Sequence, residues 1–508
     1  MGKFYVTTAI PYVNAAPHIG FAMEAIQADV LRRYHTMKGD ETYYLTGVDE
    51  HGVKLYETAQ EAGEDTQKFA DKYAEKFEDL KEVLNLSNDS FIRTTSDEHK
   101  KAAQKLWKAL VAKGDIYKGS YKGFYCAGCE AFILEKDLVD GKCPNHDKAP
   151  KVLEEENYFF KLSKYSDQIK ELIKSDKLRV LPESRKNEML NIIGTEGLRD
   201  VSFSRPKDVL PWGIDVPDDA TQVMYVWCDA LSNYITGIGY GESDDPVGGG
   251  ELFEKFWPCD AHVIGKDILR FHAGIWIGML LSAEIPVPKA VYVHGFITSE
   301  GKKMSKSIGN VVDPLSYVDE FGVDALRYYL LREIPTGDDG DFSRDRFIGV
   351  YNSELANNLG NLANRVLMMV SRYQDGKVKG KENNPELEAK IEKIWEAYRE
   401  NFDKFNIKVA IEKAVELTDY GNKYVEIQKP WELAKADMES LEAVLYNLVE
   451  MLRNVGLMLL PIIPGKATEL LEKLGLSEGD YGYGKYFGFI KDGAKVDQGD
   501  PLFPRIEL

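Results

Sequence analysis

The first fifty residues contain a strand, a loop, a helix and a second strand, and this order strongly restricts the fold. Phe4–Ile10 is a run of β-branched and aromatic residues, and a helical pattern follows from Phe21 to about Met37. Thr42–Thr46 has the composition of a second strand. A strand–helix–strand unit favours a parallel sheet whose ligands bind at the carboxyl ends of the strands. The sequence therefore predicts an α/β, Rossmann-like domain with a parallel sheet.

The strand pattern is interrupted and then resumes. From about Tyr117 to Ala220, Gly-rich turns, three closely spaced cysteines and short charged elements predict an insertion. Strand-like runs that we expect to rejoin the same sheet follow at Gln222–Trp227, His262–Ile264 and Ala290–Val293. After about Phe347, long amphipathic patterns predict a C-terminal all-α helical bundle. The predicted domains are a first Rossmann half, the insertion, a second Rossmann half, a linker domain and the helical domain: 1–116, 117–220, 221–293, 294–347 and 348–508.

Two pairs of potential metal ligands lie within the predicted insertion. Cys126 and Cys129 are followed, after thirteen residues, by Cys143 and His146. Two such paired-ligand turns can close a tetrahedron around Zn²⁺, and four protein ligands leave no open position for catalysis. We therefore predict one structural zinc knuckle. Three incidental cysteines and a surface histidine are the alternative.

Composition restricts the compartment and the partners. Five cysteines in 508 residues are too sparse, and odd in number, for a disulfide framework. The sequence contains no run of about 18 apolar residues that predicts a membrane span, and its start lacks a secretory signal. We expect a cytoplasmic protein without membrane contact. The net charge of −19 argues against general coating of nucleic acid but permits a local basic surface.

Two loops far apart in the sequence carry groups that suit phosphate. His18 and Gly20 lie where the first loop meets the first helix, so an imidazole and backbone N–H groups would face an anion there. Far downstream, Lys303 and Lys306 lie within Gly-Lys-Lys-Met-Ser-Lys-Ser, a loop able to clamp a triphosphate. Each signal alone is weak, because a solvated basic loop is common.

Together, the Pro-His-Ile-Gly and Lys-Met-Ser-Lys-Ser sequences resemble the paired ATP motifs of class I aminoacyl-tRNA synthetases. This resemblance implies attack of an amino-acid carboxylate on the α-phosphate of ATP, bound with Mg²⁺, and then transfer to a tRNA 3′ end. It makes His18, Lys303 and Lys306 the catalytic residues, with Gly20 also at the ATP. Phe21 departs from the motif, since a second histidine is common there, and we expect it to be a packing residue.

Within class I, the chain resembles the methionyl-tRNA synthetase family over essentially its whole length. The resemblance is carried by Ile10-Pro11-Tyr12, Gly47–Gly52, Tyr225–Ala230, Gly265–His272 and Trp276. It implies formation of methionyl-adenylate from L-methionine and ATP, and transfer to tRNA(Met) for initiation and elongation. It assigns the substrate ammonium to Asp49 and the ATP ribose to Gly265 and Asp267. The residues implied to line the side-chain pocket are Tyr12, Trp227, Ala230, Tyr234, Phe271, His272 and Trp276.

An aromatic pocket suits methionine, because the thioether is polarizable, flexible and a weak acceptor for a donor such as the Tyr12 hydroxyl or a His272 N–H. Ordinary core aromatics are the alternative reading. Phe271 and Trp276, five positions apart, do not share a clean face of an α-helix. The insertion of roughly 100 residues, about one small domain, is shorter than the editing insertions of the isoleucyl, valyl and leucyl enzymes, which favours the methionyl family.

The helical third carries candidates for recognition of tRNA. Asn357, Asn361 and Arg365 recur every four positions and line one stripe of a helix. Trp431, directly after Pro430, offers a ring on which an unstacked base can lie. The family resemblance implies that these four residues contact the CAU anticodon; surface amides and a half-buried tryptophan are the alternative. The sequence stops soon after the bundle without an appended tRNA-binding domain, which predicts a monomer.

Two other functions stay open from the sequence. A catalytically inactive relative that keeps the fold and binds RNA is supported only by Phe21. A different class I specificity, or another nucleotidyl transferase, would keep both ATP motifs. Amino-acid-dependent exchange of pyrophosphate into ATP separates these readings.

Overall fold

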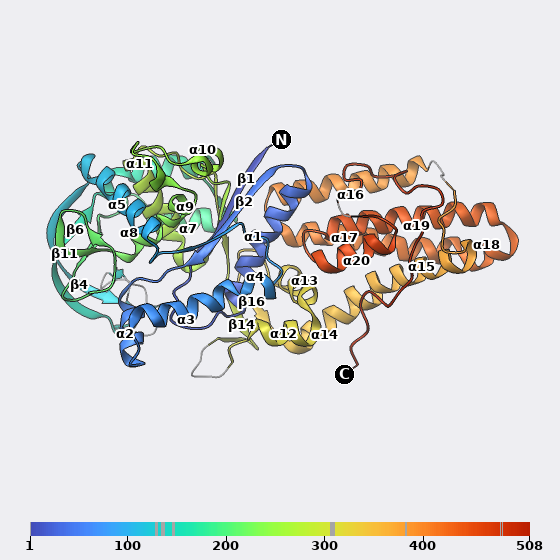
Figure 1. Ribbon diagram of the computed structural model, residues 1–508, viewed down its shortest axis with the longest axis horizontal. Coiled ribbons are helices and arrows are strands. Elements are labelled where there is room, and N and C mark those ends of the chain that lie inside the picture. The colour runs from blue at the N-terminus through green and yellow to red at the C-terminus, as the bar shows by residue number, and fades with distance from the viewer. Residues whose placement is uncertain are drawn as a thin grey trace. The chain divides into compact units, whose positions relative to one another are not determined.

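The computed structural model describes residues 2–126, 131–133, 138–144, 148–304, 310–380, 384–477, 479 and 481–507 (Figure 1). The chain forms two compact units. Unit 1 comprises Met1–Ala28, Glu41–Glu82 and Leu86–Phe296. Unit 2 comprises Asp29–Asp40, Val83–Asn85 and Ile297–Leu508.

A six-stranded parallel sheet with the order β3-β2-β1-β12-β13-β7 forms the centre of unit 1. Its strands are β1 (Lys3–Thr8), β2 (Glu41–Val48), β3 (Ser90–Arg93), β7 (Arg179–Leu181), β12 (Ala261–Gly265) and β13 (Ala290–His294). The chain adds β2 and β3 on one side of β1 and later β12 and β13 on the other. The strand order therefore reverses between β1 and β12, where ligands of doubly wound sheets bind.

The helices of unit 1 that follow β3 in the chain share one hydrophobic core with this sheet. The strands β12 and β13 are buried along their whole length, as parallel strands covered on both faces must be. The helical segments of this part of the chain are α1 (Ile19–Met37), α2 (Val53–Glu61), α3 (Thr66–Glu78), α4 (Leu80–Val83), α5 (Asp97–Ala112), η2 (Leu162–Tyr165), α6 (Ser166–Lys174), α7 (Glu183–Ile193), α8 (Val226–Ala230), α9 (Asn233–Thr236), η3 (Tyr240–Glu242), α10 (Glu251–Phe256), η4 (Lys266–Ile268), η5 (Phe271–Trp276) and α11 (Ile277–Ser282).

Strands β2 and β3 approach each other very closely at Gly47. This residue lies opposite Ile92 in the register, and a Cβ atom at position 47 would lie 2.1 Å from the Ile92 carbonyl oxygen. Because that oxygen belongs to the backbone of β3, which is hydrogen-bonded to β2, it has little freedom to move away. Only glycine fits at this position, and the strand ends one residue later, directly before Asp49.

Two strands depart from the expectation drawn from sequence. The strand β11 (Asp219–Met224) pairs antiparallel with β9 (Ser204–Pro206) and β10 (Asp215–Val216) in a separate sheet, so the prediction that Gln222–Trp227 rejoins the parallel sheet is wrong. The first half of β11 is partly or fully exposed, whereas a strand inside a parallel sheet is buried on both faces. Conversely, β7 comes from the range predicted as an insertion and pairs in parallel with β13.

A four-stranded antiparallel sheet carries part of the predicted metal site. Its strands are β4 (Ile116–Cys126), β5 (Ala131–Ile133), β6 (Lys151–Phe160) and β8 (Val201–Ser202). Cys126 ends β4 and shares a small buried cluster with Cys143 and Leu138. The other two predicted ligands, Cys129 and His146, lie outside the described residues. Among the residues that the structure does describe, no group of three or more His, Cys, Asp or Glu side chains is arranged to hold a metal ion.

Unit 2 contains a small sheet and a set of long helices, drawn in yellow to red in Figure 1. The sheet has the order β15-β14-β16, with β14 (Ile297–Ser299), β15 (Lys302–Lys303) and β16 (Gly340–Phe342). The helical segments are α12 (Pro314–Phe321), α13 (Val323–Glu333), α14 (Arg344–Val350), η6 (Tyr351–Gly360), α15 (Asn361–Gln374), α16 (Pro385–Asp403), α17 (Ile407–Gln428), α18 (Pro430–Ala436), α19 (Met438–Leu459) and α20 (Pro464–Lys473). Both main parts of the predicted fold class are therefore present.

Buried ion pairs tie segments of unit 2 together. Arg327 donates to the Asp29 carboxylate at 2.7 Å, and both side chains are fully buried. Glu450 and Arg453 form a second fully buried pair at 3.0 Å. The Glu450 carboxylate also accepts the backbone N–H groups of Phe489 and Ile490, so this pair fixes the segment that follows α20. Within the described ranges, no helix combines the length and hydropathy needed to cross a bilayer.

Candidate active site

The predicted site residues of unit 1 follow the carboxyl ends of the parallel strands. Tyr12 follows β1, Asp49 follows β2 and Asp267 follows β12. The backbones of Tyr12 and Asp49 form a parallel bridge, in which the Asp49 N–H donates to the Pro11 carbonyl at 2.9 Å. The loops after β1 and β2 therefore lie side by side at this edge of the sheet.

His18 lies directly before the first residue of α1, and its side chain is exposed. The Gly20 N–H donates to His18 Nδ1 at 3.1 Å. In the neutral ring the proton therefore lies on Nε2, which is a donor suited to an anion. Phe21, at the position where the motif commonly has a second histidine, packs its ring edge-on against Phe77 with centroids 5.2 Å apart. Phe21 is thus a packing residue, as expected.

Gly265 and Asp267, the residues assigned to the ribose, lie next to a buried pair that the sequence did not reveal. A Cβ atom at position 265 would lie 2.9 Å from Asp267 Oδ1 and 3.9 Å from His294 Nε2. That nitrogen lies 2.8 Å from Glu24 Oε2. Burial raises the pKa of Glu24. Burial opposes protonation of His294, but the hydrogen bond and charge of Glu24, together with the Gly295 carbonyl and the charge of Asp267, outweigh it and raise the pKa of His294.

Five of the predicted pocket residues contact one another. Trp227 stacks on Phe271 with ring centroids 3.9 Å apart and planes 6° apart. The rings of His272 and Trp227 meet edge-on with centroids 6.2 Å apart, and the Tyr234 hydroxyl lies 2.6 Å from His272 Nε2. The ring of Tyr234 is also 5.9 Å from that of Trp276. The structure therefore brings these aromatic residues together from two separate stretches of sequence.

The five-position spacing of Phe271 and Trp276 is explained by the local helix type. Residues Phe271–Trp276 form η5, which is a π-helix. Its hydrogen bonds join residues five apart, so such residues lie nearly over one another, as they do not in an α-helix. The spacing that argued against a shared face is therefore compatible with one pocket wall. Ala230 is buried at the end of α8.

His272 is a neutral acceptor in this arrangement. Its Nδ1 lies 3.0 Å from the Ile268 carbonyl, which can only accept, so Nδ1 carries the proton and Nε2 accepts from the Tyr234 hydroxyl. Burial lowers the pKa of His272 to about 4. Both ring nitrogens are thus engaged, which corrects the suggestion that a His272 N–H donates to the thioether. Tyr12 is the other donor suggested by the sequence.

Behind the pocket, His262 holds the Trp276 indole. The Trp276 Nε1–H donates to His262 Nε2 at 3.2 Å, so His262 Nδ1 carries the proton and donates to Thr7 Oγ1 at 2.8 Å. Burial keeps the pKa of His262 well below its ordinary value. Sequence analysis did not identify His262. The sequence signal that could have identified it is a histidine in the short run Ala-His-Val-Ile-Gly, whose other residues are apolar or glycine.

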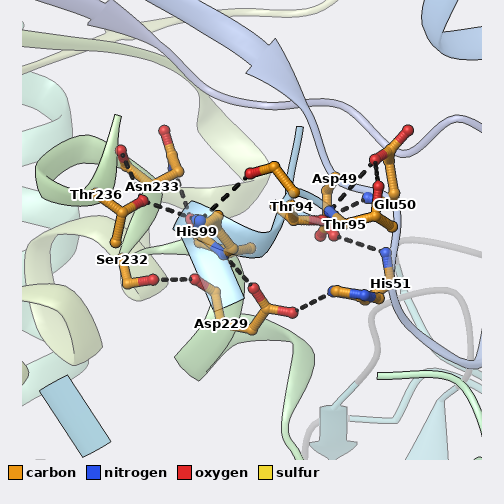
Figure 2. Close-up of polar contacts among 12 residues, drawn as sticks. Asp49, Glu50, His51, Thr94, Thr95, His99, Asp229, Ser232, Asn233 and Thr236 are labelled. Carbon is orange, nitrogen blue, oxygen red and sulfur yellow. Dashed lines mark hydrogen bonds and ion pairs between the residues drawn. The ribbon is translucent and has the colours of Figure 1, made fainter. Parts of the chain in front are cut away.

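The turn after β2, residues 49–51, is surrounded by buried polar groups (Figure 2). The Glu50 N–H donates to Thr94 Oγ1 at 2.9 Å. The Glu50 carboxylate accepts from Arg93 Nε at 2.8 Å and from the Thr95 hydroxyl. Thr94 and Thr95 follow β3, so neighbouring strands of the sheet fix the turn that carries Asp49.

The two lysines of the second ATP motif belong to unit 2. The backbone of Lys303 forms β15 and pairs with Thr298 of β14. Lys306 lies outside the described residues.

The predicted anticodon residues Asn357, Asn361 and Arg365 lie along consecutive helical segments of unit 2. Asn357 is exposed on η6, which is a π-helix, and Asn361 begins α15. Asn361 donates to Asn422 Oδ1 at 3.2 Å, and Arg365 donates to Glu426 Oε1 at 2.7 Å. These contacts form a polar ladder between α15 and α17.

Trp431 lies at the start of α18, directly after Pro430. Lys429 lies between α17 and α18, and its positive φ of 45° interrupts the helical backbone there. Trp431 is 39 % exposed. An indole presented in this way is suited to stacking with a base.

Comparison with known proteins identifies the family. Residues 4–150 and 136–367 match the family described as tRNA synthetases class I (M), and residues 374–507 match the anticodon binding domain of methionyl tRNA ligase. Methionine–tRNA ligases of Thermotoga maritima and Brucella suis are 42 % and 40 % identical to the chain. Each match covers 99 % of this chain, with 80 % and 98 % of the relatives' own lengths. The chain belongs to the class I methionyl-tRNA synthetase family.

A solved member of this methionyl-tRNA synthetase family has the same fold. The Mycobacterium tuberculosis methionyl-tRNA synthetase in complex with methionyl-adenylate superposes with a TM-score of 0.94 at 38 % identity. The match covers 99 % of this chain and all of that one. The predicted activity is therefore confirmed: the chain is a methionine–tRNA ligase, an ATP-dependent aminoacyl-tRNA ligase. An inactive relative and a different class I specificity are set aside.

Proposed function

We propose how the residues of this ligase divide the first step between them. Asp49 binds the ammonium of L-methionine, and the thioether lies against Tyr12 and the aromatic pocket. The methionine carboxylate attacks the α-phosphate of ATP; a new P–O bond forms as the bond to pyrophosphate breaks. Magnesium enters with the ATP. The supporting observation is that Tyr12 and His18 follow β1, Asp49 follows β2 and Asp267 follows β12, which are adjacent strands at the reversal point.

Charge stabilisation is assigned to three residues. The Nε2–H of His18, aimed by the hydrogen bond from Gly20 to Nδ1, donates to the phosphates. Lys303 and Lys306 neutralise charge as it moves toward the leaving pyrophosphate. Such a displacement needs positioned donors and cations more than an acid–base pair. Gly265 lets the ribose approach the backbone, and Asp267 accepts from its hydroxyl groups.

In the second step the amino acid moves to the tRNA. A hydroxyl of the terminal ribose at the tRNA 3′ end attacks the carbonyl carbon of methionyl-adenylate, an ester forms, and AMP leaves. We assign recognition of the anticodon to Asn357, Asn361, Arg365 and Trp431, in which amides and a guanidinium read base edges while the indole stacks. Residues 374–507, which include Trp431, match an anticodon binding domain, and this supports the assignment for Trp431.

A structural zinc ion is part of the proposal. Cys126 and Cys143 are buried in one small cluster, a thiolate pair that suits Zn²⁺, and Cys129 and His146 would complete the set. The ion would hold the insertion together without taking part in either step. Metal analysis of the purified protein should find about one zinc per chain, and Cys143→Ser should lose it.

We further propose a cytoplasmic monomer with the domain ranges 1–116, 117–220, 221–293, 294–347 and 348–508. Light scattering of the purified protein tests the oligomeric state.

Methionine-dependent exchange of labelled pyrophosphate into ATP tests the central proposal. Exchange should need methionine and should fall with Asp49→Ala by on the order of 10² in kcat/KM for methionine, because a charged partner of the ammonium is lost. Unchanged kcat/KM in this variant would remove Asp49 from the amino-acid site.

A further inference from the structure

Asp229 joins two histidines from different parts of unit 1. It lies on α8, and its two carboxylate oxygens face different imidazoles (Figure 2). Oδ2 lies 2.6 Å from His51 Nδ1, and Oδ1 lies 2.7 Å from His99 Nε2. His51 follows β2 and His99 lies on α5, so one carboxylate connects three elements.

This network is buried and its hydrogen bonds have definite directions. Asp229, His51 and His99 are 1 %, 3 % and 1 % exposed. Burial alone would raise the pKa of Asp229, but the two imidazoles outweigh it and lower the pKa to about 2. An ionised carboxylate only accepts, so His51 Nδ1 and His99 Nε2 both carry protons. His99 Nδ1 lies 2.7 Å from Thr236 Oγ1, which completes the chain at the end away from Asp49.

His51 connects Asp229 to the amino-acid site. The His51 backbone N–H donates to Asp49 Oδ1 at 3.1 Å, while its side chain is held by Asp229. The rotation of the His51 peptide therefore sets one hydrogen bond to the carboxylate that takes the substrate ammonium. Trp212 covers the turn, because its indole N–H donates to the Glu50 carbonyl at 2.6 Å and its ring meets that of His51 edge-on.

We propose that Asp229 is a positioning residue for amino-acid binding, acting through His51 to fix the carboxylate of Asp49. The inference rests on the proposed role of Asp49. Asp229 lies two residues after Trp227, within a segment that the sequence resemblance quotes, yet none of the roles assigned above includes it. Because the buried carboxylate has a protein partner on each oxygen, it acts on geometry rather than on the substrate itself.

The proposal predicts a selective loss of methionine affinity. His51→Ala and Asp229→Asn should each raise the KM for methionine about tenfold in pyrophosphate exchange, since a misplaced binding group loses affinity steeply. The KM for ATP and the kcat should stay within twofold, because only the amino-acid contact is disturbed. Asp229→Asn keeps the side-chain volume and decides the question should His51→Ala not fold.

Rescue and a matched control separate positioning from mere stability. In His51→Asn the amide nitrogen takes roughly the place of Nδ1 and can still donate to Asp229, so the methionine KM should return to within threefold of the wild type. Thr236→Val removes one buried hydrogen bond from the far end of the same chain. It should lower the melting temperature while the methionine KM stays within twofold.

Several results would overturn the proposal. The proposal fails if the methionine KM is unchanged in His51→Ala or Asp229→Asn. It also fails if the KM for ATP rises equally, or if His51→Asn is as impaired as His51→Ala. The Asp49→Ala variant distinguishes the two levels of inference. If it leaves methionine affinity intact, the proposed function of Asp49 fails; if it does not, only the role of Asp229 is rejected.

Discussion

The edge of the parallel sheet and the face between α15 and α17 hold polar residues in opposite ways. At the sheet edge, Asp229 and its two histidines are almost completely buried, and each makes hydrogen bonds to protein. On the helical face, the side chains of Arg365 and Glu426 are 26 % and 62 % exposed. Buried networks impose one geometry, whereas exposed pairs contribute little and can change partners. Under the proposed roles, small-molecule chemistry takes place where side chains are fixed, and tRNA recognition where they are more exposed.

Removal of the histidine donor at the sheet edge should have the largest effect. His18→Ala should lower the rate of methionine-dependent pyrophosphate exchange by on the order of 10² or more, because a donor to the developing phosphate charge is lost. His18→Gln, which retains an N–H near the Nε2 position, should recover part of the rate. An unchanged rate in His18→Ala would remove this residue from the catalytic site.

Loss of the exposed indole should affect only the second region. Trp431→Ala should weaken tRNA binding by about 1–3 kcal/mol, roughly tenfold in the KM for tRNA, because base stacking is lost. Trp431→Phe should keep most of the affinity. Pyrophosphate exchange should stay unchanged in both variants; a parallel loss of exchange would indicate misfolding.

The pH dependence of the free energy of unfolding tests the comparison further, because burial shifts the pKa of a histidine. The pKa of His272 is lowered by burial to about 4, while that of an unfolded histidine is about 6.5. Between these two pKa values the imidazole is protonated in the unfolded chain but neutral in the folded protein, so the free energy of unfolding falls as the pH falls. His272→Gln should reduce the slope of the free energy of unfolding by up to about 1.4 kcal/mol per pH unit. Urea titrations from pH 6 to pH 4.5 measure it, and parallel slopes would contradict the neutral state of His272.

The smallest effect is expected on the helical face. Glu426→Gln should change the free energy of unfolding by less than about 0.5 kcal/mol, because the pair with Arg365 is largely solvated. The same substitution at Glu450, where the pair with Arg453 is fully buried, provides a matched control with a clearly larger loss. Equal losses at the two positions would abolish the distinction between fixed and exchangeable polar groups.

Short-range sequence patterns predicted those helices and strands that depend on interactions between neighbouring residues. The alternation from strand to helix to strand predicted β1, α1 and β2, with ends within two or three residues of those observed. Long amphipathic periods predicted the helices that follow about Phe347. The run Gln222–Trp227 misled because its strand character does not specify a partner; the exposed residues at the start of β11 place it in a different sheet.

Contacts between distant residues left no signal in a single sequence. Asp229 is 178 positions from His51 and 130 from His99, and Glu24 is 270 from His294. The proton positions on His262 and His272 follow from their partners, which only the fold supplies. The spacing of Phe271 and Trp276 was visible, but its meaning required the knowledge that η5 is a π-helix.

The close approach of β2 to β3 at Gly47 also limits how this protein can evolve. With the Ile92 carbonyl oxygen only 2.1 Å from where a methyl group would start, no codon other than those for glycine can be accommodated there. A fully randomised library at this position, selected for growth of cells that depend on the enzyme, should return a single amino acid. Such invariance would result from the spacing of β2 and β3 and not from a contact with the substrate.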